Sequence, residues 1–220
     1  MTDATDWLAW HEAYDDPTSS LSRRLAVVRR HLGEVLDALS GAGPVRLLSL
    51  CAGDGRDVID VLHRRASASD TEMGAAVSAV LVEQYPELCR HAMAAVIANE
   101  LAHVEVRCAD AGDPASFADV LPVDVLLLCG IFGNIAHREV RHVIEAVPSM
   151  LHPGGSVIWT RGGSLPDRRP EIRTWFRAAG FDELTFEGEP EPFGVGVHRL
   201  VRDHSDQRRP LPDVLFTFSS

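Results

Sequence analysis

Apolar residues in this chain alternate between short continuous runs and longer stretches with helical spacing. The short runs are rich in Val, Leu and Ile, which favours strands, and they lie at residues 45–50, 77–82, 104–108, 123–129 and 155–160. The helical stretches lie between them, at residues 57–66, 86–101, 114–120 and 137–151. Runs without polar alternation are typical of strands buried on both faces, so the pattern predicts a parallel sheet covered by helices on each side.

The N-terminal residues precede this alternation and are predicted to be helical. Residues 6–16 have the pattern of a short amphipathic helix that ends at Pro17. Residues 21–39 then place their apolar side chains on one face of a second helix. The arginines of the second helix are expected on its solvated face: Arg23, Arg24, Arg29 and Arg30.

The alternation stops after residue 160. A helix is predicted over 170–179, and two strands, 181–186 and 195–201, follow with no helix between them. Consecutive strands without a crossover helix pair antiparallel. The predicted fold class is therefore α/β, a Rossmann-like three-layer sandwich whose seven-stranded, mostly parallel sheet ends in an antiparallel strand pair. A last apolar stretch, 211–218, is expected to dock on this domain or on a partner chain.

Length and charge narrow the class of protein further. The 220 residues are enough for one α/β domain with a full core, and 45% of them are hydrophobic. The net charge of −11 gives no electrostatic reason to bind a phosphate backbone, so no nucleic-acid partner is expected. No apolar run approaches the roughly 18 residues that span a bilayer, and the acidic N-terminus lacks a signal-peptide core, so we expect a cytoplasmic protein without a membrane partner.

Neither the cysteines nor the histidines have the spacing of a metal site. The four cysteines form no Cys-x-x-Cys pair and are expected to be free thiols: Cys51, Cys89, Cys108 and Cys129. The ten histidines include no His-Glu-x-x-His motif. No bound metal is therefore expected.

The most informative segment is the turn after the first predicted strand. The strand over 45–50 is followed by Cys51-Ala52-Gly53-Asp54-Gly55, and a helical pattern begins at Asp57. Glycines let the backbone turn tightly and approach a ligand with no Cβ in the way, so this arrangement predicts a nucleotide-like cofactor. A dinucleotide fingerprint, Gly-x-Gly-x-x-Gly, needs a third glycine where this chain has Val58, which disfavours NAD.

At this turn the chain resembles the class I, Rossmann-like S-adenosylmethionine-dependent methyltransferases, whose first motif typically reads Leu-Asp-Leu-Gly-Cys-Gly-Thr-Gly-Arg. The chain has Leu48-Ser49-Leu50-Cys51-Ala52-Gly53-Asp54-Gly55-Arg56, in which Ser49 replaces the usual acid and Cys51 the first glycine. Four further matching segments follow in the family's order: Glu83, Cys108-Ala109-Asp110-Ala111, the stretch 128–134, and Leu151-His152-Pro153-Gly154-Gly155. The resemblance covers about residues 21–201 and is nearest to an uncharacterised actinobacterial-type branch.

The resemblance implies roles for residues at the strand ends. In this family an acid in the place of Glu83 holds both ribose hydroxyls, one in the place of Asp110 accepts the adenine amino group, and carbonyls near Gly130 receive the methionine ammonium. The cofactor-binding residues that it implies are Trp10, Tyr14, Cys51, Ala52, Gly53, Asp54, Gly55, Glu83, Gln84, Ala109, Asp110, Ala111, Cys129, Gly130 and Asn134. The cofactor would be S-adenosylmethionine, and the product S-adenosylhomocysteine.

Methyl transfer from a sulfonium is an in-line displacement, so the protein mainly has to align the reactants. The candidate catalytic residues are His137, Arg161 and Tyr14, and Trp159 is a further candidate close to Arg161 in the sequence. His137 is either a base or the start of a helix, and Arg161 either binds an anionic substrate or faces solvent. Trp10 and Tyr14 share a helix face, and they either roof the cofactor or pack the helix on the domain.

These observations predict an S-adenosylmethionine-dependent methyltransferase that acts on a small molecule. Amino methyltransferases of bases or glutamine often have Asn/Asp-Pro-Pro-Tyr after the fourth strand, where this chain has Cys129-Gly130-Ile131-Phe132. The expected organisation is a helical lid over 1–20, a methyltransferase domain over 21–201 and a tail over 202–220, in a monomer or homodimer. Two alternatives stay open: a cofactor-binding regulatory or partner protein that does not methylate, and an NAD-type oxidoreductase.

Overall fold

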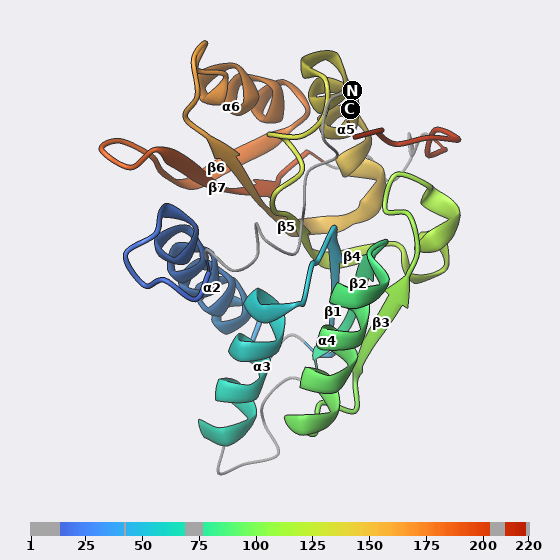
Figure 1. Cartoon of the computed structure of the whole chain (residues 1–220). Coiled ribbons are helices and arrows are strands. Elements are labelled where there is room, and N and C mark those ends of the chain that lie inside the picture. The colour runs from blue at the N-terminus through green and yellow to red at the C-terminus, as the bar shows by residue number, and fades with distance from the viewer. Residues whose placement is uncertain (1–13, 42, 69–76, 203–209, 219–220) are drawn as a thin grey trace.

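A computed structural model describes residues 14–41, 43–68, 77–202 and 210–218. Its seven strands form one sheet in the order β3-β2-β1-β4-β5-β7-β6 (Figure 1). The strands are β1 (Val45–Leu50), β2 (Val77–Glu83), β3 (Val104–Cys108), β4 (Val123–Leu128), β5 (Leu151–Gly162), β6 (Phe181–Glu187) and β7 (Phe193–Leu200). Strand β7 pairs antiparallel with both β5 and β6, and the other pairs are parallel, so the predicted fold class is confirmed.

Helices cover both faces of the sheet. They are α2 (Ser20–Ala38), α3 (Arg56–Ala68), α4 (Pro86–Ala98), α5 (His137–Met150) and α6 (Arg169–Ala178). The first three lie on one face, and α5 and α6 lie on the other (Figure 1). The helix predicted over 6–16 falls almost entirely outside the described residues.

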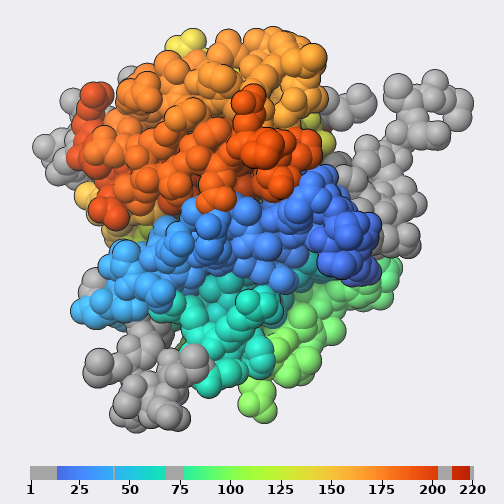
Figure 2. All heavy atoms as spheres, turned by 90° about the vertical axis from the view of Figure 1, so that its left-hand side faces the viewer, coloured from blue at the N-terminus to red at the C-terminus, as the bar shows by residue number. Residues whose placement is uncertain are grey.

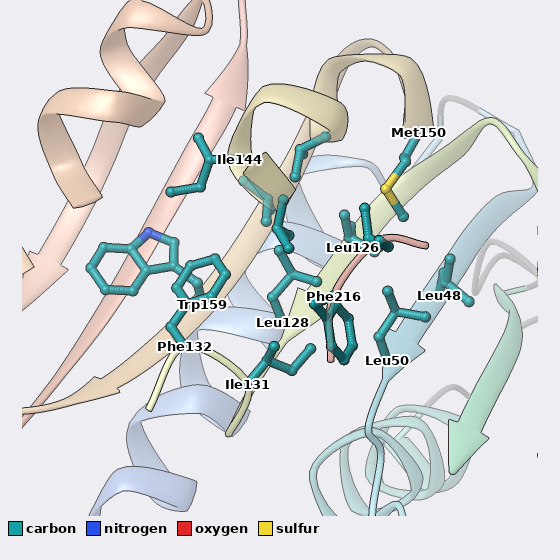
Figure 3. Close-up of a cluster of buried hydrophobic side chains, with 14 of the residues drawn as sticks. Leu48, Leu50, Leu126, Leu128, Ile131, Phe132, Ile144, Met150, Trp159 and Phe216 are labelled. Carbon is teal, nitrogen blue, oxygen red and sulfur yellow. The ribbon is translucent and has the colours of Figure 1, made fainter. Parts of the chain in front are cut away.

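Successive side chains of the central strands enter two different clusters. Leu48 and Leu50 of β1 pack with residues of α5 and α6, whereas Leu47 packs with residues of α2 and α3. Figure 3 shows the first cluster, to which α5 contributes Ile144 and β4 contributes Leu126 and Leu128. This alternation follows from the two-residue period of a strand, and it explains why the runs are apolar throughout.

The prediction of a helix over 114–120 was wrong. The structure has two 3₁₀ turns there, Pro114–Ser116 and Ala118–Val120, separated by Phe117. Phe117 has a φ of −147° and a ψ of −1°, outside the helical region, and its side chain is fully buried in the core. Burial of this ring stabilises the structure, and here it prevails over the local helical pattern.

The arginines of α2 do more than face solvent. Arg23 forms an ion pair with Glu191, and Arg30 one with Glu187 of β6. Arg29 pairs with Asp60 of α3 on the other side. Figure 2 shows α2, in blue, lying between the C-terminal strands and α3. These contacts hold α2 across the sheet face, where it can cover the strand ends.

Candidate functional site

A cavity of about 910 Å³, including the part open to solvent, lies at the carboxyl ends of β1, β2 and β4. The strand order reverses between β1 and β4, which is where ligands bind in open α/β sheets. This position, with both apolar and charged lining residues, suits a nucleotide-like ligand. The residues that line it are Tyr14, Arg24, Leu25, Val28, Cys51, Ala52, Gly53, Asp54, Arg56, Asp57, Glu83, Gln84, Tyr85, Leu88, Asp110, Ala111, Cys129, Gly130, Thr160 and Phe218.

The glycine turn forms the floor of this cavity. Cys51, Gly53 and Gly55 have φ values of 54°, 60° and 70°, in the left-handed region that favours glycine. Cys51 therefore takes the backbone shape of the glycine that it replaces, at a cost of about 1–2 kcal/mol. Gly55 does not line the cavity, and a Cβ there would lie 2.8 Å from Leu81 and 2.9 Å from Ile59. It lets α3 pack closely on β2.

Glu83, at the end of β2, fixes the turn from the neighbouring strand. Its side chain is buried, and its Oε2 accepts a hydrogen bond from the backbone N–H of Gly53 at 2.8 Å. Its Oε1 accepts one from the N–H of Tyr85 at 2.9 Å. A carboxylate has about four acceptor positions, so this side chain can still accept hydrogen bonds from a ligand in the cavity that it lines.

Tyr14 lies between two arginines on the other side of the cavity. The Nη2 of Arg24 donates to its hydroxyl oxygen at 3.0 Å, and the guanidinium of Arg56 lies 4.8 Å from the centre of its ring. Arg56 also forms an ion pair with Asp54. Burial raises the pKa of Tyr14, so this side chain is a neutral phenol at pH 7 and not a base.

Asp57 lies in the first turn of α3 and lines the cavity. Burial raises its pKa to about 6, and the nearby charge of Asp54 acts in the same direction. The N–H of Val58 donates to its Oδ1 at 2.8 Å. Burial also raises the pKa of the Cys51 and Cys129 thiols, which therefore stay protonated. Asp57 alone among these groups changes charge close to neutral pH.

Several predicted site residues lie outside the cavity. Ala109, Asn134, His137 and Arg161 are not among its lining residues. The amide of Asn134 donates to the Gly130 carbonyl at 2.5 Å, so it shapes the turn that follows β4. The Nε2 of His137 lies 3.0 Å from Glu171, and its ring lies 4.8 Å from that of Trp175. His137 thus joins α5 to α6.

Of the two tryptophans among the predicted site residues, the structure describes only Trp159. Trp159 is fully buried within β5, where its indole N–H donates to His198 at 3.1 Å, so it is a core residue and does not line the cavity. Its neighbour Thr160 lines the cavity instead and accepts a hydrogen bond from the N–H of Gly130 at 2.9 Å. Trp10 lies outside the described residues.

Other lining residues escaped the sequence analysis: Arg24, Leu25, Val28, Arg56, Asp57, Tyr85, Leu88, Thr160 and Phe218. For two of them, Asp57 and Arg24, the sequence carried a signal that could have predicted their place in the site. Asp57 directly follows a ligand-binding turn, at the start of a helix. Arg24 comes three residues after Leu21 and four before Val28, so it lies on the side of α2 that carries apolar residues.

Neither a metal site nor a membrane span is present in the part of the chain that the structure describes. No group of three or more His, Cys, Asp and Glu side chains there could hold a metal ion. No described helix is both long and apolar enough to cross a bilayer.

Comparison with known proteins gives one family. Residues 21–169 match the model of the family described as "Putative methyltransferase". No curated protein matches the chain by sequence.

Solved structures with the same fold include several methyltransferases. An O-methyltransferase family protein from Burkholderia thailandensis aligns with a TM-score of 0.58 at 19% identity, over 84% of this chain and 60% of that one. An O-methyltransferase family 2 protein from Planctomyces limnophilus, in complex with apigenin, aligns with a TM-score of 0.61 at 16% identity, over 83% of this chain and 60% of that one. The N-terminal domain of EvdMO1 with SAH bound aligns with a TM-score of 0.55 at 17% identity, over 81% of each chain. The chain thus spans about three fifths of the two O-methyltransferases.

Proposed function

The chain belongs to this methyltransferase family and is an S-adenosylmethionine-dependent enzyme, and we propose that its acceptor is a small molecule. The observation that carries the proposal is the cavity at the ends of β1, β2 and β4, which α2 and Tyr14 partly cover. Because α2 and Tyr14 cover part of this cavity, a small acceptor reaches it more readily than a folded macromolecule does. The net charge of −11 also disfavours a nucleic-acid substrate.

The lining residues fit the parts of the cofactor. We assign the ribose to Glu83, whose carboxylate lines the cavity and already orders the glycine turn. The adenine goes to Asp110 and Ala111, on the neighbouring strand end. Arg24 and Asp57 also line the cavity and carry opposite charges. We assign the carboxylate of the methionine part to Arg24 and its ammonium group to Asp57.

The chain's own residues contribute alignment and exclusion of water. When bound, the cofactor supplies the electrophilic methyl group. Val28 and Leu25 of α2 offer an apolar wall that keeps water away from the reacting atoms. Tyr14, Cys51 and Cys129 stay protonated, so they do not deprotonate an acceptor. We therefore propose an acceptor whose nucleophilic atom needs no base stronger than the lining carboxylates, of which Asp57 is ionised at pH 7.5.

The raised pKa of Asp57 leads to a prediction about the pH dependence of cofactor binding. Its pKa of about 6 means that it is ionised at pH 7.5 and mostly protonated at pH 5. Because only the ionised form attracts an ammonium group, we expect the Kd of S-adenosylhomocysteine to rise about tenfold between these pH values. Isothermal titration calorimetry at both pH values measures this change.

Two controls isolate the role of Asp57. Adenosine carries no ammonium group, so its affinity should not change with pH over this range. Asp57→Asn should bind S-adenosylhomocysteine more weakly at pH 7.5 and lose the pH dependence. If Asp57→Asn keeps the wild-type pH dependence, another group binds the ammonium.

A binding and turnover panel tests the proposed function. We expect the protein to bind S-adenosylmethionine and S-adenosylhomocysteine but not NAD, and to methylate at least one member of a panel of small phenols, carboxylates, amines and thiols. The panel also contains a peptide library and total RNA. Methylation of only these macromolecules would refute the small-molecule proposal. Cofactor binding without turnover on any acceptor would favour the regulatory alternative.

The cellular setting is proposed on the same basis. The cysteines of the described residues are unpaired, which is typical of proteins in a reducing compartment, and we propose a cytoplasmic location. A monomer or homodimer without nucleic-acid or membrane partners is expected. The organisation into a lid over 1–20, a domain over 21–201 and a tail over 202–220, and the actinobacterial-type branch, stay predictions.

A further inference from the structure

The C-terminal segment, residues 210–218, returns to the domain beside the cavity. It lies outside residues 21–169, which the family model matches. Leu215 and Phe216 are buried in the same core cluster as β1 and β4. Figure 3 shows the ring of Phe216 pointing toward Leu50, at the end of β1 where the glycine turn begins.

Gly112 joins this segment to the predicted adenine site. The N–H of Leu215 donates to the carbonyl of Gly112 at 2.8 Å. The N–H of Gly112 donates in turn to the Oδ1 of Asp110 at 2.7 Å. A Cβ on Gly112 would lie 2.3 Å from the carbonyl oxygen of Phe216, so only glycine permits this approach. The position of the segment and that of the Asp110 carboxylate are thereby coupled.

A second set of contacts holds the end of the segment. The Oε1 of Glu139, in α5, accepts hydrogen bonds from the Thr217 hydroxyl at 2.8 Å and from the Thr217 N–H at 3.2 Å. Ile135 and Phe218 form an antiparallel bridge. The segment is therefore held at Leu215, at Thr217 and at Phe218, the residue that meets the cavity.

Phe218 lines the cavity together with Asp110 and Ala111. Its ring contacts Phe216 edge to face, with centres 5.8 Å apart. We infer that residues 210–218 are a strap that completes the adenine end of the cofactor site, with Phe218 packing against the base, an inference that rests on the proposed function. An aromatic ring at the adenine end can stack on the purine. This stacking is independent of the hydrogen bond that Asp110 would accept from the adenine amino group, so the two contacts add to each other.

Docking of the strap and binding of the cofactor then stabilise each other. A ligand that contacts only the docked form shifts the equilibrium toward that form. Amide exchange at Leu215 and Thr217 should become slower when S-adenosylhomocysteine is bound, since their N–H groups are bonded only while the strap is docked.

Calorimetry on three forms of the full chain tests the inference. We expect Phe218→Ala to bind both S-adenosylhomocysteine and adenosine about tenfold more weakly than the wild type. Phe218→Tyr keeps the ring and should bind like the wild type. Val214→Ala removes an exposed strap side chain and serves as the matched control, with unchanged affinity. Thermal unfolding checks that each variant is folded.

Two outcomes would overturn the inference separately from the proposed function. Wild-type affinity of a folded Phe218→Ala for both ligands would show that Phe218 does not contact the base. A loss for S-adenosylhomocysteine but not for adenosine would place Phe218 at the methionine end and overturn the adenine assignment. If the wild type itself binds no S-adenosylhomocysteine, the proposed function fails and the strap inference fails with it.

Discussion

Glu83→Ala is expected to weaken S-adenosylmethionine binding by about ten- to a hundredfold, because a buried carboxylate bonded to a ligand contributes roughly 1.5–3 kcal/mol. The side chain would lose its bonds to the ribose and, in addition, the bond from its Oε2 to the N–H of Gly53 at 2.8 Å. The glycine turn would then lose one of the contacts that order it. Calorimetric Kd values for S-adenosylmethionine and adenosine should rise together, since both ligands carry the ribose.

Two further variants define the cause of this loss. Glu83→Gln keeps one acceptor oxygen and should fall between the wild type and Glu83→Ala. Glu87→Ala, four residues later in the first turn of α4, removes a half-exposed carboxylate that pairs with Arg90 and should leave the affinity unchanged. Unaltered affinity in a folded Glu83→Ala protein would mean that another acid holds the ribose.

The second large effect concerns stability at acid pH. His198 of β7 is fully buried, its Nδ1 accepts the Trp159 indole N–H at 3.1 Å, and its ring stacks on Phe176. Burial lowers its pKa from 6.5 to about 4, although Glu183 acts in the opposite direction. Between these two pH values the unfolded chain binds a proton at this position and the native protein does not. Protonation therefore favours unfolding as the pH falls below 6.5.

We expect His198 to lower the free energy of unfolding by about 2 kcal/mol at pH 5 relative to pH 7.5. The raised pKa of Asp57 has the opposite effect, since its native carboxyl binds a proton before the unfolded one does. Urea unfolding of the wild type and of His198→Asn at both pH values isolates the histidine, because both proteins keep Asp57. The difference in the free energy of unfolding between the two proteins should change by about 2 kcal/mol from pH 7.5 to pH 5.

A surface histidine provides the control for this measurement. His142→Asn, on the exposed side of α5, should follow the wild type at both pH values. If the difference between the wild type and His198→Asn does not change with pH, His198 titrates normally and its burial does not suppress protonation.

The local pattern of the sequence was enough to predict the fold and the turn at its centre. Buried parallel strands are apolar throughout, and their carboxyl ends meet at one edge of the sheet, so the residues after each apolar run could be grouped from the sequence alone. The strand over 45–50 and the tight glycine turn after it follow from this local reasoning, whereas Glu83 was assigned to the site through the resemblance to the methyltransferase family.

Residues that reach the cavity from distant elements could not be predicted in this way. Arg24 comes from a helix that lies across the sheet face, and Phe218 comes from a segment that returns after the last strand. Their positions depend on the angle of α2 and on the Gly112 turn. Neither has a local signature, because packing between elements decides which side of a residue meets the ligand.

The sequence by itself thus determined the order of the elements, the class of the sheet and the cofactor turn, because hydrophobic periodicity and glycine conformation are local properties. Only the tertiary structure decided which charged and aromatic side chains enter the cavity. It placed Trp159 in the core and His137 beside Trp175, and it brought Arg24 and Asp57 to the cavity. Burial of large rings is favourable and burial of charges is costly, and both depend on contacts between residues far apart in the chain.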